Sequence, residues 1–363
     1  MKSLKIKKFF ENNILYIDSK ERIEFDKGFL VSINKDKKIE RINIKQNKFS
    51  KLLSKSSIME RLLRLQPRYV TKLEENIFLC SDNGGLWIID FVKKEQWLVF
   101  KYLPGTNNPL HFVEYCRNGK KEIVFGDYGG KDTDGNIGVY RYADFKVERI
   151  ACFNGSKIDH IHRVDYDKYR DCYWIFTGDS DSASGIWRLE YGSGVIEEYL
   201  KGSQQLRSCV CFILENKIIY ATDSPIEKNY IYSIDIKDKK INQICGIPGT
   251  CIYGHRQVID GEEIYFLATA VEPDTKLDKI RYRLTYKLGE GIQDRYVHLL
   301  AGNQNEFKEV WKTKKDNWPM WLFQFGNIRF ATQKIDDRVV FYTQSCREKG
   351  TYMIKLGDDK YEK

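Results

Sequence analysis

The sequence predicts an all-β fold, a β-propeller of seven four-stranded blades, with six blades as the alternative. A basic or titratable residue recurs after a short apolar step at intervals of 47, 51, 45 and 48 residues. A period in the 40s is typical of propeller blades when the chain is rich in strands. The chain has 23 Tyr, 20 Phe and only 7 Pro, a composition that favours strands. The recurring positions are Arg64, His111, His162, Arg207 and His255, and Trp321 takes the same place after a longer gap of 66.

The unit that begins at His160 shows four short strands most clearly. Turn residues separate each predicted strand from the next, at the spacing expected for a blade. The four predicted strands cover 160–165, 172–177, 185–189 and 195–200.

The other units follow the same plan. The predicted strands lie at 64–73, 77–81, 86–91 and 97–102; from 110, then 123–125, 138–142 and 147–153; at 207–214, 217–222, 230–236 and 240–245; at 254–259, 263–268, near 280–286 and 307–312; and at 321–325, 339–343 and 352–356.

The N-terminal region supplies a further set at 4–10, 14–18, 29–34 and 39–44. This set makes the seventh unit, unless its strands complete the last blade and leave six. Closure into a ring would leave only short sheet edges. We expect one propeller domain over residues 1–363, a helical insertion at 49–65 and a blade insertion near 272–296.

Charge and cysteine usage restrict the possible partners. The net charge of +9 comes from Lys scattered over turns and the N-terminal region, so we expect a solvated surface and no nucleic-acid partner. No apolar run reaches the length of a membrane span or of a signal peptide. Nine Cys without a CxxC pair predict buried, reduced thiols in a cytoplasmic protein. The oligomeric state stays open.

Aspartates follow the basic positions after 18, 16, 17 and 16 residues, at the ends of the second strands. Since adjacent strands of a blade are antiparallel, the two sets should meet on one face of the ring. A concave mouth lined by cations and carboxylates is where a ligand site is expected. These aspartates are Asp82, Asp127, Asp179 and Asp223.

The same pairs have a structural interpretation. In WD-repeat propellers a histidine before the first strand bonds an aspartate of a turn, and His162 with Thr177, Asp179 or Asp181, and Trp187 resembles that network. The alternation of Arg with His, and additional polar groups such as Gln204, favour a ligand site instead.

Two kinds of chemistry are open at such a mouth. His160 and His162 share a face of one strand and, with His255, could bind a divalent transition metal. Without metal, Arg64, Arg207 and Arg256 could hold an anion. His162 or His255 could then act as acid or base, because histidine titrates near neutrality.

The substrate-binding candidates beyond these are His111, Gln204, Asp127 and Trp321, and the catalytic candidates are His162, His255, Asp179, Asp223 and Tyr128. His298 lies in the expected blade insertion and is expected to be a surface residue.

Several motifs resemble known propeller families. Ser32–Asp36 and Tyr140–Asp144 resemble degenerate Asp boxes of sialidase-like (BNR-type) propellers. That resemblance implies an arginine triad, imitated by Arg64, Arg207 and Arg256, and a Tyr nucleophile, Tyr128 or Tyr253.

A second resemblance covers most of the chain from Arg61 to about Gly261. The combination of His160–His162, Thr177–Asp179, Gly202–Gln204 with Arg207, and Thr222–Ser224 is similar to bacterial propellers associated with surface-polysaccharide assembly. It implies a carbohydrate context. At the level of the fold, the chain also resembles oligogalacturonate-lyase-type propellers, which use a His/Gln metal site.

The sequence therefore predicts a carbohydrate-active propeller that acts on an anionic saccharide by lyase or glycoside hydrolase chemistry. The alternatives are a non-catalytic propeller that binds a glycan or a protein, and a purely structural scaffold.

Overall fold

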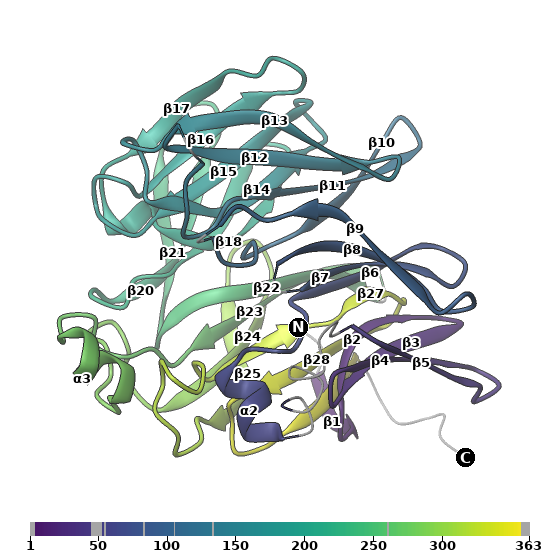
Figure 1. Ribbon diagram of the computed structural model, residues 1–363. Coiled ribbons are helices and arrows are strands. Elements are labelled where there is room, and N and C mark those ends of the chain that lie inside the picture. Colours follow the sequence, from purple (N-terminus) through teal and green to yellow (C-terminus); the bar gives the residue numbers. More distant parts are fainter. Residues whose placement is uncertain are drawn as a thin grey trace.

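The computed structural model describes residues 4–44, 53, 56–82, 84–104, 106–132, 134–259 and 261–356. Its strands form seven sheets arranged as a ring (Figure 1), and every pairing is antiparallel except that of β2 with β27. The fold is a seven-bladed β-propeller, as the sequence predicts, and the six-blade alternative is wrong. No helix in the described ranges is long and apolar enough to cross a membrane.

Five consecutive sheets each take four strands in chain order, from the innermost strand to the outermost. The first comprises β6 (Tyr69–Glu74), β7 (Ile77–Asp82), β8 (Gly85–Asp90) and β9 (Glu95–Lys101). The second comprises β10 (Val113–Arg117), β11 (Lys120–Gly126), β12 (Asn136–Ala143) and β13 (Lys146–Asn154). The third comprises β14 (His160–Asp167), β15 (Cys172–Gly178), β16 (Gly185–Glu190) and β17 (Ile196–Lys201).

The fourth and fifth of these sheets follow the same order. The fourth comprises β18 (Ser208–Ile213), β19 (Lys217–Thr222), β20 (Asn229–Asp235) and β21 (Ile241–Ile247). The fifth comprises β22 (Thr250–Ile259), β23 (Glu262–Ala270), β24 (Tyr296–Gly302) and β25 (Phe307–Lys314).

The two remaining sheets combine both ends of the chain and close the ring. One joins β27 (Thr332–Lys334) to β2 (Asn13–Asp18), β3 (Glu21–Asp26), β4 (Phe29–Asn34) and β5 (Ile39–Asn43). The other joins β26 (Asn327–Phe330), β28 (Arg338–Gln344) and β29 (Gly350–Leu356) to β1 (Leu4–Phe10) as its outer strand. Figure 1 accordingly shows purple and yellow strands side by side.

The apolar core lies between neighbouring sheets. Trp174 and Phe176 of β15, for example, pack with Tyr220 of β19, and all three side chains are almost completely buried. Such layers leave the polar ends of the inner strands facing the central axis, where a ligand site can form.

The structure corrects several sequence-based element assignments. The predicted strand near Ile280–Tyr286 is wrong: Lys279–Leu284 form the helix α3, capped by Asp278, and the third strand of that blade is β24. His298 is therefore a buried strand residue, bonded to Glu309 and Asp294, and not a surface residue.

Four further assignments differ. The predicted strand at 321–325 is a turn region, and β26 begins only at Asn327. The charged strand β3 was missed, and β1 belongs to the last blade. Within the expected helical insertion at 49–65, the structure has α2 (Ser57–Leu62), which Ser56 caps; residues 49–52, 54 and 55 lie outside the described residues.

Candidate functional site

His160 and His162 converge because the first strand of their blade contains a β-bulge. Register places His160 opposite Gly178 and Ile161 opposite Thr177, and then shifts so that His162 has no partner. A bulge re-aims the side chain of the additional residue. The Nε2 atoms of the two histidines consequently lie 3.0 Å apart, and both side chains are buried.

Asp179 completes this cluster from the loop after β15. Its Oδ1 lies 3.1 Å from His162 Nε2 and 3.5 Å from His160 Nε2. The loop is held by the carboxylate of Asp159, which accepts hydrogen bonds from the backbone N–H groups of Asp179 and Ser180 at 2.9 Å each. We call His160, His162 and Asp179 the His–Asp triad.

The charge state of the triad suits a cation. Burial raises the pKa of Asp179, but hydrogen bonds to the two histidines and the charge of Arg207 outweigh it and hold this pKa well below its usual range. Burial lowers the pKa of His162, so its imidazole is neutral near pH 7. A neutral imidazole and an ionised carboxylate are the forms that bind metals.

The distances of the triad fit one metal ion. A transition metal about 2.1 Å from each ligand atom separates its ligands by about 3.0 Å in octahedral and about 3.4 Å in tetrahedral geometry. The three atoms of the triad are separated by 3.0, 3.1 and 3.5 Å. Two histidines and one carboxylate are also a known donor set for divalent transition metals.

A neighbouring cluster competes less well for a metal. Cys209 and Asp223 lie close enough to His162 to form a second group of possible ligands. Burial raises the pKa of the Cys209 thiol well above its usual range, and the thiol donates to Asp223 Oδ2 at 3.1 Å. A protonated thiol is not a metal ligand, so the His–Asp triad is the better candidate.

Arg207 and Gln204 support the triad from the next blade. Arg207 donates to Asp179 Oδ1 at 2.8 Å and to the Asp179 carbonyl at 3.1 Å. Gln204 donates to the Asp179 carbonyl at 2.9 Å and to Asp181 at 2.8 Å, and it accepts from Ser224 at 2.9 Å. Such contacts orient the groups that would bind a ligand directly.

The WD-like network is present only in part. Trp187 donates to the hydroxyl of Thr177 at 3.0 Å, and that hydroxyl donates to the Ala183 carbonyl. His162 does not join this chain: its Nδ1 is buried without a partner among the described residues. The Trp187–Thr177 hydrogen bond therefore joins β15 to β16 within the blade, while His162 contacts His160 and Asp179.

A cavity of about 330 Å³ adjoins the triad near the starts of the inner strands. Tyr128 is part of its wall, and the Tyr128 ring lies 4.5 Å from that of His160. Trp321, Tyr282 and Arg64 line the same cavity, with Arg64 5.5 Å from the Trp321 ring. We call this space the arginine cavity, because Arg64, Arg68 and Arg329 line it.

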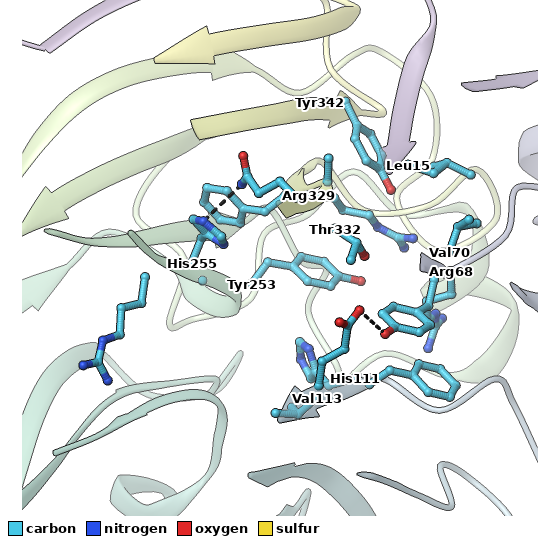
Figure 2. A pocket seen from close by; sticks show the side chains of 18 of the residues that line it. Leu15, Arg68, Val70, His111, Val113, Tyr253, His255, Arg329, Thr332 and Tyr342 are labelled. Atoms are coloured by element: carbon cyan, nitrogen blue, oxygen red, sulfur yellow. Dashed lines mark hydrogen bonds between the residues drawn. The ribbon is translucent and has the colours of Figure 1, made fainter. Parts of the chain in front are cut away.

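A second cavity of about 440 Å³ lies further along the inner strands and shares four wall residues with the arginine cavity, namely Arg68, Leu110, Tyr253 and Arg329. Figure 2 shows this second cavity, with Tyr253 near its centre and His111 and His255 on its walls. The shared residues thus line both cavities.

The structure does not bring His255 and His111 to the triad. His255 contacts Gln257 and Gln333 at 3.1 Å each, and the imidazole of His111 packs on Tyr253. Burial lowers the pKa of His255 to about 4 and that of His111 well below its usual range. Both rings are thus neutral in the second cavity, and Asp179 takes the place expected of His255.

The three arginines expected to act together are also separated. Arg256 pairs with Glu263 at 2.5 Å and lies over the Tyr265 ring, whereas Arg207 pairs with Asp179 and Arg64 lines the arginine cavity. Asp127 accepts hydrogen bonds from the Gly138 N–H at 2.8 Å and the Tyr140 hydroxyl at 3.1 Å, both within its own blade.

Some residues near the site belong to no repeat or motif that would predict them from the sequence. Glu272 is buried close to Asp223 and Arg207, and Arg68 and Arg329 reach the axis from two other blades. Each is a single residue without a local motif, so only the ring geometry assembles them.

Comparisons with known proteins support the fold. No family model and no curated protein matches the chain. An oligogalacturonate lyase from Vibrio parahaemolyticus is similar in structure, with 9% identity, a TM-score of 0.53, and coverage of 99% of this chain and 98% of the other. A chain of a mitotic checkpoint complex (6% identity, TM-score 0.54, coverage 98% and 94%) and the AfRom2 CNH domain (8%, 0.52, 99% and 100%) are similar as well.

At these identities the likeness extends to the propeller fold alone. Neither sialidase kinship nor a link to surface-polysaccharide assembly receives support from it.

Proposed function

We propose that this propeller is a metal-dependent lyase that acts on an acidic oligosaccharide at the His–Asp triad. The observation that carries the proposal is the triad itself, whose three ligand atoms lie 3.0–3.5 Å apart beside a cavity lined by arginines. The likeness to an oligogalacturonate lyase is at the level of the fold and agrees with this substrate class.

The arginine cavity favours elimination over hydrolysis. Glycoside hydrolysis uses two carboxyl groups that face one pocket. Among the described residues that line the arginine cavity there is no Asp or Glu. Elimination beside a sugar carboxylate instead needs cationic groups that neutralise that carboxylate, together with an acid and a base.

In such an elimination, a base removes the proton from the carbon next to the carboxylate, and the C–O bond at the adjacent carbon breaks. The leaving oxygen takes up a proton, and a C=C bond conjugated with the carboxylate remains. A divalent ion in the triad would withdraw electron density from the substrate carboxylate. We assign the proton donor to Tyr128, because it lines the arginine cavity and its ring lies 4.5 Å from that of His160, a member of the triad.

Metal analysis combined with turnover tests this proposal. Purified protein is dialysed against Mn²⁺ or Zn²⁺ and analysed for bound metal, and acidic oligosaccharides are screened for the ultraviolet absorbance of the unsaturated product. We expect about one metal per chain, loss of metal in His162→Ala, and in Tyr128→Phe retained metal with turnover reduced about 10²-fold or more. His298→Gln, which changes a histidine outside the mouth, is the control.

A wild-type protein that takes up no metal, or a His162→Ala variant with full turnover, would refute the proposal. Saccharide binding without turnover would instead favour the second candidate, a non-catalytic glycan-binding propeller. The arginine cavity, with aromatic and amide side chains in its wall, is the feature that favours that candidate.

A further inference from the structure

The wall of the arginine cavity combines cations with aromatic rings. Arg68 donates to the carbonyl of Asn108 at 2.8 Å, and the guanidinium of Arg329 lies 5.1 Å from the centre of the Tyr253 ring. In the part of the chain that the structure describes, neither arginine has a carboxylate within 4.0 Å. Figure 2 shows the side chains of Arg68, Tyr253 and Arg329 in the second cavity, whose wall they also form.

The charges of Arg68 and Arg329 repel one another, which is unfavourable unless an anion joins them. Burial lowers the pKa of Arg68, and the nearby charge of Arg329 lowers it further. A guanidinium remains charged in a protein, so the electrostatic cost persists in the folded state. A carboxylate or phosphate between the two groups would remove this cost through charge-assisted hydrogen bonds.

Two amide side chains around the cavity offer acceptor atoms that no described residue uses. Asn108 and Asn327 are 8% and 6% exposed, and the Oδ1 atom of each is buried without a partner among the described residues. Arg329 Nε is unpartnered in the same way. Buried polar atoms are almost always satisfied, so such atoms in a cavity wall indicate a polar ligand.

The remaining wall fits a sugar ring. The rings of Trp321 and Tyr282 lie 6.3 Å apart in the wall of the cavity. Aromatic faces pack against the C–H faces of sugars, while amides bond their hydroxyls. The volume of about 330 Å³ is at the lower end of the range for small-molecule pockets.

We infer that the arginine cavity binds one anionic sugar ring, with the acidic group of the sugar between Arg68 and Arg329 and its hydroxyls on Asn108 and Asn327. The shared chemistry is that of a sugar acid or a sugar phosphate. If the proposed function also holds, on which this last step rests, the substrate carries a second acidic sugar residue. That residue lies at the triad, next to Tyr128, while the first occupies the arginine cavity.

Calorimetric titration of the full chain tests the inference. The probes are D-galacturonate, glucose 6-phosphate and neutral galactose, each measured with a chelator present so that no metal contributes. We expect one of the two acidic sugars to bind at one site per chain, and galactose to bind at least about tenfold more weakly. The stronger acidic probe identifies the anion as carboxylate or phosphate.

Matched variants locate the site. Arg329→Gln should weaken binding at least about tenfold, because it removes a charge-assisted contact while it nearly keeps the volume. Asn327→Asp, which adds a carboxylate beside the arginines, should weaken it as well. Arg117→Gln removes the same charge from an exposed pair with Asp171 and should leave the affinity unchanged.

Equal binding of galactose, no binding of either acidic sugar, or unchanged affinity in both Arg329→Gln and Asn327→Asp would overturn the inference. The proposed function fails separately. Binding that persists in His162→Ala and with chelator, in a protein without metal or turnover, leaves the cavity assignment intact and rejects the lyase.

Discussion

His162 is held in place by a glycine as well as by its polar neighbours. A Cβ atom added to Gly178 would lie 2.4 Å from His162 Cε1, closer than any real contact allows. The strand register puts Gly178 opposite His160, so a side chain at this position would enter the space that the two imidazoles occupy. The glycine thus makes room for the triad.

We therefore expect Gly178→Ala to disturb the triad without unfolding the blade. The added methyl displaces the His162 ring from Asp179, and metal affinity should fall about tenfold or more, as measured by competition with a chelating dye. Gly246→Ala is the matched control, because a Cβ there meets only Tyr230 at an ordinary 3.7 Å. Equal affinity in both variants would show that His162 does not bind the metal.

Glu272 gives the fold a distinctive pH dependence. Burial, together with the charge of Asp223, raises the pKa of Glu272 from 4.5 to about 8. Below pH 4.5 the carboxyl is neutral in both the folded and the unfolded chain. Between pH 4.5 and about 8 it ionises only in the unfolded chain, so its contribution to stability is lost as the pH rises through this window.

Glu272→Gln should remove this dependence. The free energy of unfolding of the wild type should fall relative to that of the variant between pH 5 and pH 8, on the order of 1.4 kcal/mol per pKa unit of displacement. Urea denaturation at several pH values measures the difference. Parallel curves for the two proteins would mean that Glu272 is not kept neutral by the fold.

At the scale of the element, the repeated bulge explains which part of the site could be predicted. The unpaired residues at the starts of β14, β18 and β22 are His162, Cys209 and Ile252. The repeat of basic residues instead aligns Arg207 and His255 with His162. Arg207 lies two residues before Cys209, and His255 lies three residues after Ile252. Bulges are invisible in a spacing pattern, so the sequence placed His255 on the wrong part of its strand.

The insertion in the blade formed by β22–β25 obscured a strand in a similar way. Residues between β23 and β24 contain the helix α3, and their aromatic and aliphatic side chains read as a strand. The mixed, charged strand β3 was missed because Glu21, Arg22 and Glu24 interrupt the alternation, although its neighbours β2 and β4 satisfy its backbone. Pairing within the sheet, and not local preference, makes β3 a strand.

The strand β1 closes the ring by pairing with β29, since Ile6 lies opposite Ile354. Ile6 packs against the core cluster that contains Ile354 and Phe341, while the side chain of the adjacent Lys7 is exposed. We expect Ile6→Ala to lower the free energy of unfolding by about 1–2 kcal/mol, because it removes part of this contact. Lys7→Ala, one residue along the same strand, should change it by less than about 0.5 kcal/mol.

Thermal and urea unfolding of both variants checks this prediction. Equal stability would mean that β1 contributes no packing to the closure, and that the remaining strands of the last blade hold the ring.

At the scale of the whole molecule, the ring brings together residues that are far apart in sequence. Arg68, Tyr128 and Arg329 come from three blades, yet all line one cavity. A repeat identifies how many blades converge, but not how deep each side chain lies along its inner strand. The architecture was therefore predictable, and the division of the central space into two cavities was not.

The exposed lysines behind the net charge of +9 and the arginines of the arginine cavity should respond differently to salt. Exposed lysines attract any polyanion at low ionic strength, and this attraction is screened over about 10 Å at 0.1 M salt. Charges within a cavity are screened much less.

From about 0.05 to about 0.5 M NaCl, we expect the affinity for the acidic sugar that binds the arginine cavity to fall by no more than about threefold. Over the same range, a short single-stranded DNA should lose all measurable binding. Fluorescence anisotropy for the DNA and calorimetry for the sugar provide the two measurements. A parallel, steep loss of both would place the sugar on the exposed lysines instead of between Arg68 and Arg329.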